Sequence, residues 1–136
     1  MTSALTIPAD VWTYDAFQPG YLFGETQFRI AADRVARWQE IYGGAEENVA
    51  PPGLLVVEMM KAYLDLVHPR PPGNIHAGQK LQFLDMEAPS DAVFTARVSC
   101  KEKTRRKDRG WVTFDVILSA RDCDVLRGEI VTIWAS

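Results

Sequence analysis

A glutamate stands in the middle of the most apolar stretch of the chain. Glu58 lies within residues 53–67 (GLLVVEMMKAYLDLV), whose other members are mostly hydrophobic. A carboxyl group in poorly solvated surroundings keeps its proton more readily, and this suits a group that transfers protons. The same side chain could instead point outward or lie at a contact between two chains. Both interpretations of Glu58 stay open.

A second candidate site is Pro52-Gly53-Leu54, where the chain enters the same stretch. Proline is favoured in the first turn of a helix, and a glycine lets another molecule approach the backbone closely. The unpaired N–H groups at a helix start favour negative charge that develops on a nearby oxygen. The segment could therefore bind a ligand, or it could merely begin a helix.

His76 is the remaining candidate, because the sequence contains only two histidines. Its ring could hydrogen-bond a backbone carbonyl where a helix meets a sheet, or it could border the candidate site and act as a base. The two cysteines, Cys100 and Cys123, have no metal-ligand spacing and are expected to be reduced thiols. We expect no metal and no cofactor.

The pattern of apolar residues predicts the elements that would position these groups. Residues 53–67 are apolar almost all round, which predicts a long buried helix. A strand with a possible bulge at Gly24 is expected over 21–30, and a short amphipathic helix, with Asp33 as its cap and Gly43-Gly44 as its end, over 33–42. The remainder predicts an antiparallel meander of four strands, at 75–87, 92–105, 110–120 and 125–134.

A single long apolar helix can be covered only by a sheet that curves around it, so the fold class is α+β. The length of 136 residues suits one domain over 1–136, with an irregular lead-in at about 1–20.

Two segments resemble a known family. Residues 50–55 (APPGLL) resemble the start of the central helix in MaoC-type and acyl-carrier-protein dehydratases, and residues 73–83 (GNIHAGQKLQF) resemble a strand of the N-terminal MaoC-like dehydratases. The resemblance implies a single hotdog fold, a curved antiparallel sheet wrapped around a long central helix. It also implies a 3-hydroxyacyl-thioester dehydratase or enoyl-CoA hydratase, which is a lyase.

The resemblance assigns roles to the candidate residues. Pro52, Gly53 and Leu54 would bind the substrate, with the thioester carbonyl at the helix start, and Glu58 or His76 would transfer the proton. The implied ligand is an acyl-CoA or acyl-carrier-protein thioester. The implied assembly is a homodimer, or a hetero-oligomer with another hotdog chain.

The sequence departs from the family at the catalytic dyad. MaoC hydratases carry an Asp and a His in the loop after the first helix, whereas residues 42–49 (YGGAEENV) contain neither. The histidine of the acyl-carrier-protein dehydratases corresponds to Gly44. Whether the chain is an enzyme therefore stays uncertain. The alternatives are a hotdog acyl-CoA thioesterase, a non-catalytic acyl-thioester binding protein, or the inactive partner subunit of a heteromeric hydratase.

Charge and hydropathy narrow the partners. The net charge of −3 argues against nucleic acid. No apolar run approaches about 18 residues, so no membrane span is expected, and the first residues lack a secretory signal, so we expect a cytoplasmic protein. The charged run 101–109 (KEKTRRKDR) could meet phosphates of coenzyme A or the acidic face of a carrier protein, but an ordinary solvated turn is favoured.

Overall fold

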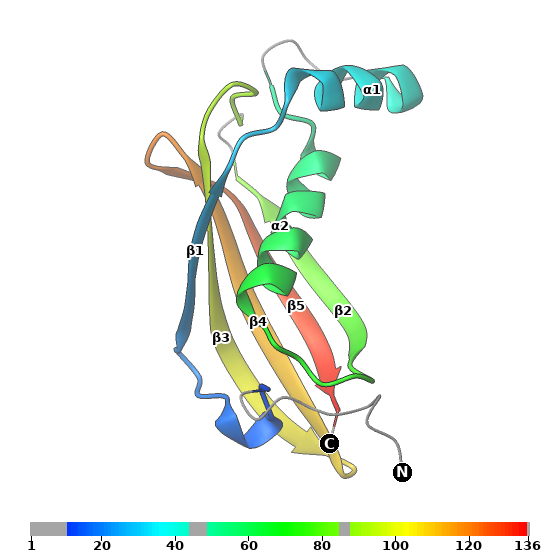
Figure 1. The fold of residues 1–136 in the computed structure, drawn as a ribbon, viewed down its shortest axis with the longest axis vertical. Helices are drawn as coiled ribbons and strands as arrows, with labels where there is room; N and C mark the ends of the chain where they lie inside the picture. The colour runs from blue at the N-terminus through cyan, green and yellow to red at the C-terminus, as the bar shows by residue number, and fades with distance from the viewer. Residues whose placement is uncertain (1–10, 44–48, 85–87, 136) are drawn as a thin grey trace.

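The computed structural model describes residues 11–43, 49–84 and 88–135. A five-stranded antiparallel sheet curves along one side of a long helix, and a shorter helix lies across that helix's amino end (Figure 1). The elements in chain order are η1 (Tyr14–Ala16), β1 (Leu22–Phe28), α1 (Ala32–Tyr42), α2 (Pro52–Leu66), β2 (Ile75–Phe83), β3 (Phe94–Arg106), β4 (Arg109–Ala120) and β5 (Cys123–Trp134). All the predicted helices and strands are present, and the segment 85–87, where the predicted β2 would have ended, lies outside the described residues.

The strand order is β1-β3-β4-β5-β2, which corrects the predicted four-strand meander. Strands β3, β4 and β5 do form a meander, because two-residue turns with positive φ join them at Lys107-Asp108 and Arg121-Asp122. Strand β2 instead pairs with β5, and β1 occupies the place beside β3. No two-residue turn joins β2 to β3, and these two strands are not neighbours in the sheet. Strands β1 and β2 are therefore the two edges.

The bulge predicted in the first strand is confirmed. The register of β1 against β3 shifts between Leu22 and Gly24, and Gly24 has a φ of +145°. A Cβ at this position would lie 3.3 Å from Leu66 Cδ2, so the glycine also allows the end of α2 to approach the strand.

Helix α2 packs against the concave face of the sheet. Leu55, Met59 and Tyr63 are buried, and the Met59 sulfur occupies the space that a side chain at Gly128 of β5 would need. Burial is not complete, however, because Val57 is 48% exposed on the other side of the helix. The expectation of a helix buried all round is therefore wrong for the side that faces away from the sheet. Strand β4 is buried along its inward face, whose alternate residues are all buried: Val112, Phe114, Val116 and Leu118.

Helix α1 begins one residue earlier than predicted, so Asp33 is not its cap. Ala31 precedes the helix without a side-chain cap, and Asp33 lies in the first turn, where its carboxylate is 3.7 Å from Arg37. The predicted end is confirmed at Gly43, whose N–H donates to Gln39 O and whose φ is +67°. Gly44 lies outside the described residues.

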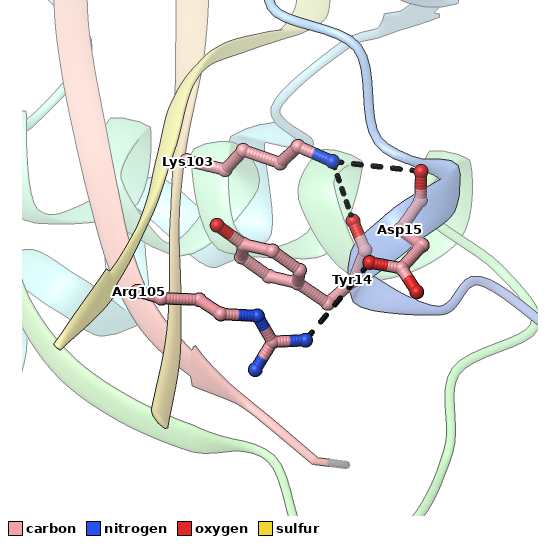
Figure 2. A network of polar contacts seen from close by, with 4 residues as sticks. All are labelled: Tyr14, Asp15, Lys103 and Arg105. Atoms are coloured by element: carbon pink, nitrogen blue, oxygen red, sulfur yellow. Dashed lines mark hydrogen bonds and ion pairs between the residues drawn. The ribbon is translucent and has the colours of Figure 1, made fainter. Parts of the chain in front are cut away.

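The charged run forms the β3–β4 hairpin, in agreement with the predicted turn. Figure 2 shows how η1 fastens it: Lys103 Nζ donates to Tyr14 O at 3.0 Å, and Arg105 lies 3.9 Å from the Asp15 carboxylate. The Arg105 guanidinium stacks 4.4 Å from the centre of the Tyr14 ring. A side chain at Gly110 would collide with that ring, so the glycine makes room for this contact. Among the described helices, none is long and apolar enough to cross a membrane.

Candidate functional site

The three predicted binding residues form the first turn of α2. Pro51 caps the helix, and its carbonyl accepts hydrogen bonds from Leu54 N–H at 3.0 Å and Leu55 N–H at 3.3 Å. In the part of the chain that the structure describes, no backbone carbonyl accepts a hydrogen bond from Gly53 N–H. The helix therefore presents one unpaired donor at its positive end, the kind of group that binds a carbonyl oxygen or an anion.

An aromatic ring from α1 lies where a side chain at Gly53 would be. A Cβ built on Gly53 would lie 2.3 Å from both Cη2 and Cζ2 of Trp38. No side chain fits there unless the indole moves. The structure thus gives a reason for the glycine besides the ligand approach expected from the sequence: the indole packs directly on the helix backbone.

Glu58 lies on the α1 side of α2 and is buried, with 5% of the residue exposed. Its Oε1 accepts a hydrogen bond at 2.5 Å from Nη1 of Arg34, whose side chain is 38% exposed. A buried carboxylate without a partner would be costly, so this ion pair accounts for its tolerance on an apolar helix. A carboxylate accepts hydrogen bonds at both of its oxygens, and Arg34 engages only Oε1, so Oε2 of Glu58 is the oxygen that could accept a proton from a substrate. The residue also borders a shallow depression with Thr26, Gln27, Phe28, Lys61, Ala62 and Asp65.

Arg34 and Trp38 were not among the site residues predicted from the sequence. Their spacing could have indicated that they act together, because residues four apart in a predicted helix lie on the same face. That face of α1 contacts both candidate groups of α2, the first turn at Gly53 and the carboxylate of Glu58.

His76 lies elsewhere in the chain. It is exposed near the beginning of β2, opposite Thr132 of β5, and β2 begins beside the carboxyl end of α2 (Figure 1). Within the described residues its ring makes no hydrogen bond, so the expected bond to a backbone carbonyl is absent there. The structure places both Gly53 and Glu58 in contact with α1. His76 instead lies at the opposite edge of the sheet from β1, the strand beside Glu58.

Solved structures with the same architecture decide the fold. A MaoC-like dehydratase from Rhodospirillum rubrum matches with a TM-score of 0.72 at 16% identity, over 90% of this chain and 96% of that one. The chain has a hotdog fold. R-hydratase PhaJ1 from Pseudomonas aeruginosa matches with a TM-score of 0.68 at 18% identity, over 90% and 85%. The HadBC 3R-hydroxyacyl-ACP dehydratase complex from Mycobacterium tuberculosis gives 0.64 at 12% identity, over 79% and 90%. No family model and no curated protein match the sequence.

The fold predicted from the resemblance to MaoC-like dehydratases is thus confirmed, with α2 as the central helix of the hotdog. The two candidate groups on α2 are one to two helical turns apart, on a helix that packs against the sheet.

The outer face of the hotdog sheet carries a separate group of charges. Lys101 Nζ on β3 is 2.8 Å from the Glu129 carboxylate on β5, and Asp115 on β4 lies opposite Glu129. Partial burial raises the pKa of Asp115 above its ordinary value, although the nearby Lys101 opposes the shift. These residues face away from α2 and play no part in the candidate site.

Proposed function

We propose that this hotdog protein binds an acyl thioester, presented by coenzyme A or by an acyl carrier protein, with the thioester carbonyl at the amino end of α2. One observation carries the proposal: the unpaired N–H of Gly53 and the buried carboxylate of Glu58 both lie in the first two turns of α2, where Trp38 and Arg34 of α1 contact these two residues. Pro52 and Leu54 complete the turn that holds this N–H in place.

The pair is suited to chemistry at the carbon next to the carbonyl. A hydrogen bond from Gly53 N–H stabilises the negative charge that the carbonyl oxygen gains when that carbon loses a proton. Glu58 accepts the proton from C2 of a 3-hydroxyacyl thioester and returns it to the departing C3 hydroxyl. The products are water and an enoyl thioester, and the reverse reaction is hydration.

A second hotdog chain belongs to this proposal. Edge strand β2 exposes three large apolar side chains, those of Ile75, Leu81 and Phe83, along a row of free backbone groups. Pairing of β2 with a second chain, either another copy or a different hotdog protein, would cover them. His76 stands on the same strand, so it enters the chemistry only if this pairing brings it to the site of the second chain.

A non-catalytic role is the second candidate, and the positions of the histidines favour it. Both His68 and His76 are exposed, and His68 follows the carboxyl end of α2, far along the helix from Gly53. A chain that binds the thioester while its partner supplies the catalytic dyad would have this arrangement.

The deciding experiment uses the purified protein with crotonyl-CoA. Calorimetry measures binding, and parallel assays measure hydration of the double bond and release of free thiol. Binding with hydration supports the lyase, and binding without turnover supports the partner subunit. Thiol release would indicate the thioesterase, and the absence of binding would contradict the proposed site.

A further inference from the structure

Helix α1 touches the proposed site at two points. Helix α1 lies across the amino end of α2 (Figure 1), and Arg34 and Trp38 are one turn apart on α1. Arg34 hydrogen-bonds the Glu58 carboxylate, and the indole of Trp38 lies against Gly53. Gly53 and Glu58, on which the proposed function depends, are therefore the two residues of the site that α1 contacts.

Both contacts compete with a ligand. A thioester bound at Gly53 N–H would lie against the Trp38 ring, which occupies the position of a Cβ on the same residue. Arg34 donates to Oε1 of Glu58 at 2.5 Å, so a substrate that gives its proton to Glu58 has to share the carboxylate with this guanidinium. In the conformation that the structure shows, both the binding group and the base are covered by the same helix.

Few buried contacts hold this helix in place. No residue of α1 is buried, and Ile41 and Tyr42 near its end are 72% and 67% exposed. Val35 and Trp38 are partly buried against the core. Segments with few buried apolar contacts open at a small fraction of the global unfolding free energy, so α1 can move while α2 and the sheet stay folded.

We propose that α1 is a lid on the acyl-thioester site, closed by Trp38 over Gly53 and by Arg34 on Glu58, and that ligand binding lifts it. The inference rests on the proposed function, because it takes Gly53 and Glu58 as the site. In this proposal, closure of α1 and binding of the ligand exclude each other. The apparent affinity is the intrinsic affinity multiplied by the fraction of molecules that are open.

The lid predicts in which direction the rate of ligand binding changes when either contact is weakened. Weakening either contact raises the open fraction, so Arg34→Gln and Trp38→Leu should each bind crotonyl-CoA several-fold faster than the parent protein in stopped-flow measurements. Arg37→Gln is the matched control, because Arg37 lies on the same helix and pairs with Asp33 at the exposed surface. Its association rate should equal that of the parent.

Hydrogen exchange of the unaltered protein supplies a second measurement that does not depend on how the variants fold. Saturating crotonyl-CoA should make the amides of α1 exchange faster, since the ligand holds the lid open. Slower exchange in α1, or slower association of both variants, would show that α1 is a wall of the site and would overturn the lid. If parent and variants all fail to bind, the proposed function itself is contradicted.

Discussion

Arg34 on α1 and Glu58 on α2 form an ion pair at the amino end of the central hotdog helix, with the carboxylate buried and the guanidinium partly exposed. The guanidinium can return to solvent at modest cost, whereas the carboxylate has no other cation at hydrogen-bond distance among the described residues. Removing Arg34 therefore leaves the buried carboxylate of Glu58 without its partner. Removing the charge of Glu58 instead leaves Arg34, whose guanidinium water can solvate.

The proposed role of Glu58 as a base predicts that binding and turnover can be separated. Glu58→Gln keeps the shape of the side chain and removes its ability to accept the proton. Crotonyl-CoA should bind at least as tightly as to the parent, while hydration is lost. Asp65→Asn is the control, because Asp65 borders the same depression but is exposed, and it should keep full activity. Equal turnover in Glu58→Gln and the parent would exclude Glu58 as the base.

The packing of α2 predicts a large loss of stability for a core truncation. Leu55→Ala or Met59→Ala should lower the free energy of unfolding by about 2–5 kcal/mol, because each removes a buried side chain and leaves a cavity. Lys61→Ala on the exposed side of the helix should change it by less than about 0.5 kcal/mol. Denaturant titrations measure all three. Indistinguishable midpoints would contradict the placement of α2 on the sheet.

The period of the apolar residues was sufficient to predict most of the fold. The inward alternation from Val112 to Leu118 and the apolar run of α2 each require burial, and the glycine at position 24 indicated the bulge correctly. The strand order was missed because local patterns do not say which strands pair. Only the short turns at 107–108 and 121–122 dictate neighbours, and β2 has no such turn.

The candidate site was predicted in part. Gly53 and Glu58 were visible because a glycine at a helix start and a charge in an apolar run are unusual. Arg34 and Trp38 looked like ordinary residues of a surface helix, because their partners lie on another helix. Such contacts depend on how α1 and α2 cross, which the spacing within either helix does not determine.

The apolar residues on β2 predict self-association or pairing with another hotdog chain. The parent should sediment as a dimer at micromolar concentration, and Leu81→Lys should shift it towards the monomer, because a charge is placed on the edge that pairs. Leu22→Lys, on the opposite edge at β1, is the matched control and should leave the dimer intact. A parent that sediments as a monomer and still binds crotonyl-CoA would show that the binding site does not need a second chain.

The outer face predicts a pH effect with a definite sign. Because burial raises the pKa of Asp115, the folded protein binds this proton more tightly than the unfolded chain does. Stability therefore falls as the pH rises from the ordinary carboxyl value of about 3.9 through the raised one. Asp115→Asn removes this cost, so it should be more stable than the parent at pH 7, with a difference that shrinks on acidification. A less stable variant at pH 7 in denaturant titrations would reverse the assignment.

The position of the thioester carbonyl is the central claim, and Gly53 tests it most directly. A valine there would collide with Trp38, so the comparison is made in a Trp38→Leu background, where the ring is gone. Calorimetry with crotonyl-CoA should show binding to Trp38→Leu and none to the double variant Trp38→Leu/Gly53→Val, with similar unfolding midpoints for the two. If the double variant binds as tightly as Trp38→Leu, the acyl thioester does not bind at the amino end of α2.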